Sequence, residues 1–356
     1  MEAIDAVITW VDGSDPDYQM RYDKYLSGRS DIKKQYLQSN EITFCIGSIL
    51  KYAPFVRKIF IVTDGQSPNL EEIKKFAPID KVNIVDHKEI FNGAEGFLPT
   101  FNIRSIDAVL YKINGLSEKF IYFNDDMFLI KKSSPEEWFV ENKAVLRGNW
   151  SQTYNTQPLK KISNMIKSAL KIRPSYNAAQ SKAANIAGFE WEYFRSYHSG
   201  RPQLKSVIKS FYDKNPKVLE KQLKYKFRDA KQYMPYSLCW HLLIKEDKYI
   251  AASKSSLVEI EKIRNYSPKK LKEVLSELDK NKEVKLLNIQ DLNYASEDTI
   301  LVFKSWFYNK LTNWNYKFFI TSTTLSISSL VLYSETPSLV TPPAGSKPSF
   351  WIALRA

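Results

Sequence analysis

Four short apolar runs, each followed within two residues by an acid, constrain the fold more than any other feature of the sequence. The runs are residues 6–11, 58–63, 82–85 and 120–123, and the acids are Asp12, Asp64, Asp86 and Asp125. Runs of this length are typical of strands buried on both faces of a parallel sheet. Helical spacing between them, clearest in residues 41–52, supplies the crossovers that parallel strands need. We therefore predict an α/β fold with a mostly parallel sheet.

The acids at the strand ends predict a ligand site. Ligands of open α/β sheets bind beyond the carboxyl ends of the strands, and Gly13 and Gly65 would allow close backbone approach there. One Asp in such a place is ordinary turn chemistry, but four at one edge indicate a site. The sequence contains no glycine-rich dinucleotide fingerprint and no phosphate-loop motif, which argues against common nicotinamide and ATP sites.

Asp125 and Asp126 lie between two apolar runs, residues 119–123 and 127–129. Adjacent carboxylates in such surroundings are costly unless a cation or a proton shares them. Mg²⁺ binds through one or two carboxylates plus substrate phosphates. We therefore expect Asp125 and Asp126 to hold Mg²⁺ or Mn²⁺, with a solvated Asn-Asp-Asp turn as the alternative.

The net charge of +13 is unevenly distributed. Residues 1–150 hold 19 Lys/Arg and 22 Asp/Glu, whereas residues 157–232 hold 17 Lys/Arg and 5 Asp/Glu. The basic segment predicts a surface for an anionic polymer, a nucleic acid or an anionic membrane, with a solvated helical surface as the plain alternative. Nucleic acid is disfavoured, because no recognition motif occurs and the excess charge lies away from the acidic strand ends.

The chain also carries signals about its location. Cys45 and Cys239 make no disulfide framework or metal pattern and fit a reducing compartment. Strand-like sequence begins within a few residues of Met1, which leaves no room for a signal peptide. No stretch approaches the ~18 uninterrupted apolar residues of a membrane helix. We expect a cytoplasmic protein that is at most peripheral to a membrane.

Longer motifs in these stretches resemble the Stealth family, which includes bacterial capsular-polysaccharide phosphotransferases and the animal N-acetylglucosamine-1-phosphotransferase. Residues 4–16 are similar to the family's first conserved block. Its second block is similar to residues 48–128, including Ile61-Val62-Thr63-Asp64-Gly65-Gln66 and Leu98-Pro99-Thr100-Phe101-Asn102. Shorter matches to the later blocks are His198, Phe227-Arg228 and residues 287–291.

The resemblance implies transfer of a hexose or N-acetylhexosamine 1-phosphate from a UDP-sugar to a hydroxyl of a growing glycan. The product would be a phosphodiester-linked capsular polysaccharide, and UMP would leave. A conventional glycosyltransferase, which shares the fold and releases UDP, is the alternative; a nucleic-acid-binding protein is a second. The implied partners are the UDP-sugar, an anionic glycan acceptor and the capsule assembly machinery, at the inner face of the bacterial plasma membrane.

The expected organisation has three parts. Residues 1–150 would form a nucleotide-sugar-binding catalytic core of the glycosyltransferase-A kind. Residues 151–320 would form a basic, mainly helical region on the acceptor side, within which residues 151–190 look like an insertion or mobile cover. Residues 321–356, rich in Ser, Thr and Pro, would be a poorly ordered or accessory tail.

The resemblance also distributes roles among residues. We expect the donor to contact Trp10, Asp12, Gly13, Asp64, Asn102 and Arg104. The expected catalytic residues are His198, Asp125, Asp126 and Arg228. A guanidinium pairs two phosphate oxygens at once, although an ordinary ion pair is the alternative for both arginines. His198 is the expected base and His87 its rival, whereas His241 in its apolar run is expected to be a core histidine.

Overall fold

The computed structural model describes residues 2–26, 39–169 and 175–312. All of these residues belong to one compact unit. The expected tail, residues 321–356, lies outside the described residues.

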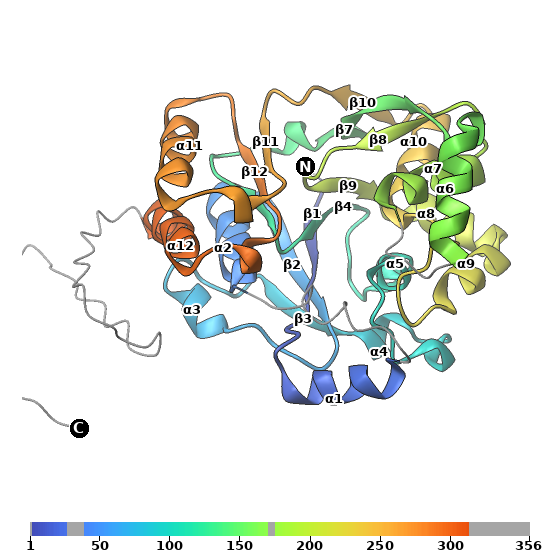
Figure 1. Cartoon of the computed structure of the whole chain (residues 1–356), viewed down its shortest axis with the longest axis horizontal. Coiled ribbons are helices and arrows are strands. Elements are labelled where there is room, and N and C mark those ends of the chain that lie inside the picture. Colours follow the sequence, from blue (N-terminus) through green and yellow to red (C-terminus); the bar gives the residue numbers. More distant parts are fainter. Residues whose placement is uncertain (1, 27–38, 170–174, 313–356) are drawn as a thin grey trace, which may run out of the picture. The chain divides into compact units, whose positions relative to one another are not determined.

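Helices and strands alternate through the first half of the chain and mix less regularly in the second (Figure 1). In chain order they are β1 (Ile4–Thr9), α1 (Pro16–Tyr25), α2 (Glu41–Tyr52), β2 (Val56–Thr63), α3 (Leu70–Lys74), β3 (Val82–Asp86), α4 (His87–Ile90), α5 (Ile103–Asp107), β4 (Lys119–Asn124), β5 (Met127–Leu129), β6 (Phe139–Val140), β7 (Lys143–Gln152), α6 (Pro158–Ala169), α7 (Tyr176–Ala187), β8 (Glu192–Ser196), β9 (Arg201–Leu204), α8 (Lys205–Lys214), α9 (Pro216–Leu223), α10 (Pro235–Lys245), β10 (Tyr249–Ala252), β11 (Leu257–Ile260), α11 (Pro268–Lys280), β12 (Leu286–Ile289) and α12 (Glu297–Thr312).

The central sheet has the strand order β3-β2-β1-β4-β9. β1 pairs with β2 and β4 in parallel, β2 pairs with β3 in parallel, and β9 closes the row antiparallel to β4. Every residue of β1 is buried, because helices cover both faces of the sheet. Figure 1 shows α2, α11 and α12 on one side and α5, α8 and α10 on the other. The predicted α/β fold with a mostly parallel sheet is confirmed.

Two smaller sheets flank the central one. One has the order β11-β12-β5, and the other has the order β10-β7-β6 with β8 paired to β7. Most of their strands come from the second half of the chain, which the sequence analysis described as mainly helical. These strands are four or five residues long, too short for an alternating pattern to stand out. The structure thus adds strands to the helices expected there.

The crossover from β3 to β4 contains short helical pieces: α5 ends at Asp107 and a 3-10 turn follows at Leu110–Lys112. Residues 151–190, expected to be an insertion or mobile cover, contain the regular helices α6 and α7. Ser175 caps α7 by accepting from the backbone N–H of Ala178, and Gly188 ends it in the left-handed conformation.

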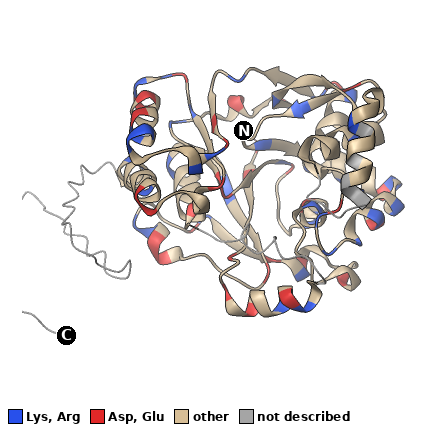
Figure 2. Cartoon of the chain, in the orientation of Figure 1, with Lys and Arg blue, Asp and Glu red and all other residues tan. Residues whose placement is uncertain are grey.

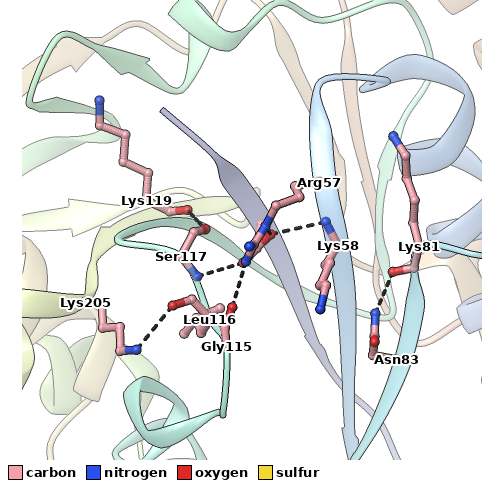
Figure 3. A network of polar contacts seen from close by, with 10 residues as sticks. Arg57, Lys58, Lys81, Asn83, Gly115, Leu116, Ser117, Lys119 and Lys205 are labelled. Carbon is pink, nitrogen blue, oxygen red and sulfur yellow. Dashed lines mark hydrogen bonds and ion pairs between the residues drawn. The ribbon is translucent and has the colours of Figure 1, made fainter. Parts of the chain in front are cut away.

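A buried acid holds the amino edge of the sheet together (Figure 3). Asp5 of β1 is fully buried and accepts from Arg57 Nε at 2.9 Å and Nη2 at 2.6 Å. It also accepts from the backbone N–H groups of Lys58 at 3.1 Å and Ser117 at 2.7 Å. The same guanidinium donates to the carbonyl of Gly115 at 2.7 Å. One carboxylate thus ties together β1, β2 and the turn that leads into β4.

Candidate functional site

The carboxyl ends of the four parallel strands meet at one edge of the central sheet. In the spatial order of the strands, this edge carries Asp86, Asp64, Asp12 and Asp125. The side chains of these four acids make different contacts. Asp86 caps α4 through the backbone N–H of Lys88, and Asp64 pairs with Arg21 at 3.1 Å. The structure therefore brings the four acids to one edge, as the sequence predicts, but within the described residues only Asp125 of the four lines a cavity.

A cavity of about 620 Å³ opens beside the end of β4. Asn124, Asp125 and Asp126 line one wall, and the opposite walls come from the second half of the chain. The residues of those walls that matter most here are Tyr176, His198, Arg201, Arg228, Tyr236 and Asp291. Asp125, Asp126, His198 and Arg228, which the sequence analysis proposed as catalytic residues, thus line one cavity together with Arg104.

His198 and Asp126 face each other in this cavity. His198 Nε2 lies 3.4 Å from Asp126 Oδ2, and the backbone N–H of His198 donates to Glu259 Oε1 at 2.6 Å. Burial opposes ionisation of Asp126, but His198, Asn288 and Arg201 together outweigh it and lower the pKa of Asp126 below its ordinary value. Asp126 is therefore an anion in the resting site.

The carboxylates at the end of β4 fit the expected metal ion. Asp126 Oδ1 is buried and has no hydrogen-bond partner among the described residues, as expected of an oxygen reserved for a ligand. Within residues 2–26, 39–169 and 175–312, no group of three or more His, Cys, Asp or Glu is arranged to hold a metal ion. Two carboxylates beside open cavity fit Mg²⁺, whose other ligands would be substrate phosphate and water.

Three arginines give the cavity its positive wall. Arg104 is 3% exposed and donates to the carbonyls of Asp229 at 3.1 Å and Ser175 at 3.4 Å. Burial, followed by the charge of Arg228, lowers the pKa of Arg104 to about 10. Arg228 Nε is buried without a hydrogen-bond partner among the described residues. The predicted phosphate-contacting arginines are thus side by side, and one retains an unused donor.

Arg201 is the third arginine, and the sequence analysis missed it. It is 2% exposed, and its guanidinium lies 4.2 Å from the ring centroid of Tyr236 and 5.3 Å from that of Tyr122. Arg201 Nη1 donates to Asn124 Oδ1 at 2.9 Å, while Nε has no partner among the described residues. Stacking on two aromatic rings fixes the guanidinium plane and directs it at the end of β4.

Only the pairing of β9 with β4, which is seen in the structure, indicates where Arg201 lies. Residues 201–204 form β9, in which Arg201 lies opposite Tyr122 of β4. The sequence Arg-Pro-Gln-Leu does not predict a strand, because proline removes a ladder donor. Proline is tolerated on the edge strand of a sheet, which is where β9 lies.

Asp107 is a carboxyl inside this positive wall. It lines the larger cavity, and its Oδ1 is buried without a hydrogen-bond partner among the described residues. Burial raises the pKa of Asp107 to about 7, although the hydrogen bond with Tyr122 and the nearby arginines act in the opposite direction. Asp107 thus holds a proton over much of the pH range in which other aspartates are charged.

A smaller cavity of about 130 Å³ adjoins the larger one. The two share Ile103, Asn124, Asp125 and Arg228 in their walls. The smaller cavity is also lined by Trp10, His87 and Thr100. Within the described residues, Trp10 Nε1, His87 Nδ1 and Thr100 Oγ1 are buried without hydrogen-bond partners. An aromatic face with several unused polar atoms suits a flat, polar ring.

Four predicted donor-binding residues line neither cavity. Asp12 accepts from the backbone N–H of Ser14 within its own turn, and the carbonyl oxygen of Gly13 accepts from Gln19 Nε2. Asp64 is paired with Arg21. Asn102 is fully buried and donates to the carbonyls of Tyr225 and Phe227, both at 2.9 Å. Their predicted contact with a donor stays a prediction, whereas Trp10 and Arg104 do line cavities.

The three histidines occupy different environments. His87 is buried in the smaller cavity, where burial lowers its pKa and Asp64 opposes the shift. His241 of α10 lies in the core: its Nδ1 donates to the carbonyl of Ser237 at 2.6 Å and its Nε2 accepts from Phe194 at 2.9 Å. Burial lowers the pKa of His241 to about 4. The prediction that His241 is a satisfied core histidine is confirmed.

The first 146 residues match a known family. Residues 2–30 match Stealth protein CR1, conserved region 1, and residues 35–146 match Stealth protein CR2, conserved region 2. The resemblance to the Stealth family that the sequence analysis described is thus confirmed over these two regions, which include β1 to β4 and Asp125 and Asp126.

Curated relatives match over the same part of the chain. Capsular polysaccharide phosphotransferase cps1A of Actinobacillus pleuropneumoniae is 41% identical over 148 residues, which are 39% of this chain and 39% of the relative. Capsular polysaccharide phosphotransferase LcbA of Aeromonas hydrophila is 39% identical over 39% of each chain. Receptor polysaccharide phosphotransferase WefC of Streptococcus oralis is 37% identical over 40% of this chain and 43% of its own. The matches span about two fifths of the length of these relatives.

Solved structures that the chain resembles include glycosyltransferases, the kind of enzyme named in the fold prediction. Galactosyltransferase LgtC aligns at a TM-score of 0.43 and 10% identity over 87% of this chain and 95% of its own. Mouse xyloside xylosyltransferase 1 aligns at 0.40 and 11% identity over 83% and 99%. At TM-scores below 0.5 the similarity says nothing about the reaction.

In the described part of the chain, no helix has both the length and the apolar character needed to cross a membrane.

Proposed function

Because residues 2–146 carry Stealth conserved regions 1 and 2, we propose that the chain transfers a sugar-1-phosphate from a UDP-sugar to a hydroxyl of a growing glycan. The product is a phosphodiester of a capsular polysaccharide, and UMP leaves. One observation carries the proposal: Asp125 and Asp126 share a cavity with Arg104, Arg201 and Arg228. Carboxylates for a metal ion and guanidinium groups for phosphate oxygens are what a diphosphate substrate requires.

The donor spans both cavities in this proposal. Its uracil enters the smaller cavity and packs on Trp10, where Thr100 and His87 offer unused polar atoms. Its diphosphate lies at the junction, beside Asp125 and Arg228, which line both cavities. A bound Mg²⁺ or Mn²⁺ on Asp125 and Asp126 would neutralise part of the diphosphate charge. The sugar then points into the larger cavity.

The reaction is a displacement at the phosphorus that carries the sugar. The acceptor hydroxyl oxygen forms a bond to this phosphorus, the bond from phosphorus to the bridging oxygen breaks, and UMP leaves with that oxygen. The hydroxyl proton goes to His198, which Asp126 orients at 3.4 Å and Glu259 holds through the backbone. His87 is the less suitable base, because it lines the smaller cavity on the nucleoside side.

The acceptor side is assigned to the second half of the chain. Its residues 157–232 carry 17 Lys/Arg and 5 Asp/Glu, and a growing phosphodiester polymer is anionic. We place the reaction in the bacterial cytoplasm, at the inner face of the membrane and with the capsule assembly machinery as partner.

The deciding experiment identifies the nucleotide product. The purified full chain is incubated with each of a panel of UDP-sugars, a glycan acceptor and Mg²⁺, and nucleotides are separated by ion-exchange chromatography. We expect UMP to accumulate in proportion to a new phosphodiester signal in the ³¹P spectrum, with none in EDTA or with Asp126→Asn. Release of UDP instead would make the protein a conventional glycosyltransferase. No turnover of any donor, together with salt-sensitive retention on heparin, would favour a nucleic-acid-binding protein.

A further inference from the structure

Helix α6 carries apolar side chains that nothing in the described structure covers. Leu159 is 82% exposed, Met165 64%, and Ile162 and Ile166 53% each. Positions 159, 162, 165 and 166 fall on one face of an α-helix. None of the α6 side chains whose burial the structure describes is buried. Four large apolar side chains on one exposed stripe are far more than the scattered single residues of an ordinary surface.

The same part of the chain is positively charged and contains no acid. Residues 142–189 hold eight Lys/Arg and no Asp or Glu. Figure 2 accordingly shows no acidic residue on α6, whereas acids and bases are mixed on α1 and α11. Lys160 is exposed within the helix, and its Nζ lies 5.8 Å from the ring centroid of Tyr154.

A tryptophan lies at the base of the helix. Trp191 is 74% exposed, and its carbonyl accepts from the backbone N–H of Thr153 at 2.9 Å. Thr153 leads into a 3-10 turn, Tyr154–Thr156, against which α6 packs. Tryptophan prefers the boundary between lipid headgroups and acyl chains, because its ring is apolar and its N–H is polar.

We propose that α6 lies in the plane of a membrane surface and attaches the chain reversibly to bilayers that contain anionic phospholipids. An apolar stripe buries itself below the headgroups while the lysines of α6, a helix without acids, face their phosphates. Charge complementarity favours this occupant over a second copy of the chain, which would bring two positive segments together. A soluble polyanion would satisfy the charges but leave the apolar stripe in water.

The attachment does not depend on the proposed reaction, but its position has a consequence for it. α7 begins at Tyr176, and Ser175 and Tyr176 both line the larger cavity. Ser175 follows the end of α6 by six residues. The rim of the cavity is therefore tethered close to the membrane-bound helix along the chain.

The first test measures partitioning of the full chain onto vesicles. Vesicles of phosphatidylglycerol and phosphatidylethanolamine are compared with vesicles of phosphatidylcholine by cosedimentation at several salt concentrations. The variant combines Leu159→Ser, Ile162→Ser, Met165→Gln and Ile166→Ser. We expect it to lower the partition coefficient on anionic vesicles about tenfold or more. Met20→Gln, at a 72% exposed position on α1, is the matched control and should bind like the parent.

The second test locates the helix in the membrane. Cys45 and Cys239 are buried, so a single introduced Met165→Cys can be labelled with an environment-sensitive fluorophore. We expect anionic vesicles to shift its emission to shorter wavelength and lipid-attached quenchers to reach it. The same label at Met20→Cys should respond to neither.

Three results would each overturn the proposal. The first is a parent chain that does not bind anionic vesicles, and the second is an α6 variant that binds them as well as the parent. The third is a label at residue 165 that shifts with protein concentration, or with heparin, in the absence of lipid, which would make this face an interface between copies or a polyanion site. None of the four substituted residues lines either cavity, so binding of a UDP-sugar, measured by calorimetry, should be equal in parent and variant, which separates this test from that of the reaction.

Discussion

The amino and carboxyl edges of the central sheet, where its parallel strands begin and end, differ in the hydrogen bonding of their buried polar groups. At the amino edge, Asp5 accepts four hydrogen bonds, from Arg57, Lys58 and Ser117. At the carboxyl edge, Asp126 Oδ1 and Arg201 Nε are buried with no hydrogen-bond partner among the described residues. Both edges belong to the same strands, so the difference lies in their side chains and not in the pairing of the backbone.

The unpaired buried atoms at the carboxyl edge lower the stability of the folded protein. A buried polar atom without a partner loses its hydration and gains nothing in exchange. Natural proteins keep such atoms where a ligand will satisfy them. We therefore interpret the amino edge as the part that stabilises the sheet and the carboxyl edge as the part that waits for a substrate. The predictions below test this interpretation.

The largest effect is expected at Asp126. Asp126→Asn removes the anion that faces His198 and the oxygen reserved for a metal, so turnover should fall about 10³-fold or more. The melting temperature should stay close to that of the parent. Asp86→Asn is the control, because Asp86 ends a strand at the same edge but caps α4. An active Asp126→Asn enzyme in EDTA would refute the metal assignment.

His198→Ala should come next. Loss of a positioned base typically lowers turnover about 10²–10⁴-fold. Donor affinity, measured by calorimetry with UDP, should change little, because the donor is held by the other wall. If His87→Ala is inactive instead and His198→Ala retains turnover, the base lies in the smaller cavity.

At the amino edge, the expected loss is in stability and not in activity. Asp5→Ala leaves the N–H groups of Lys58 and Ser117 without an acceptor, which should lower the free energy of unfolding by about 3 kcal/mol. Denaturant unfolding measures it, and the folded fraction should turn over substrate normally. Asp80→Ala, at an exposed acid, should be neutral. Equal losses for both variants would mean that the Asp5 network contributes nothing special.

His241 should make stability depend on pH. Its pKa is about 4 in the folded protein because of burial, against 6.5 as the ordinary value. Between these values the unfolded chain binds the proton and the folded protein does not, so stability falls as pH falls from about 6.5 to 4. The loss should approach about 3 kcal/mol. His241→Gln should remove this part of the pH dependence, and an unchanged profile would assign it to other groups.

A pH dependence of the opposite sign is expected at Asp107. Burial raises its pKa to about 7 in the folded protein, so the folded state holds a proton that the unfolded chain loses near the ordinary value of 3.8. Stability should therefore fall as pH rises from about 4 to 7. Asp107→Asn cannot titrate, so its stability relative to the parent should rise between pH 4 and pH 8 by about 4 kcal/mol. A relative stability that does not change over this range would show that the arginines satisfy Asp107.

The sequence predicts one wall of the site well and the other poorly. Strands β1 to β4 are continuous apolar runs, and acids mark their ends, so the edge that carries Asp125 and Asp126 could be located from periodicity alone. Arg201 could not, because its place depends on pairing with Tyr122, 79 positions earlier, in a strand that contains proline. Pairings between distant segments leave no local pattern, and short edge strands leave the least.

The pairing of β9 with β4 also bears on how the protein is made. When residues 35–146 have left the ribosome, β4 is complete but its partner β9 is still to be synthesised. The N–H and C=O groups of β4 that will pair with residues 201–204 are therefore unpaired at this stage. An open strand edge of this kind can pair with another chain. A fragment cut to the conserved regions would keep that edge for good. Expression trials that stop near residue 146 should therefore yield aggregates, whereas a chain extended past residue 204 can cap its own sheet.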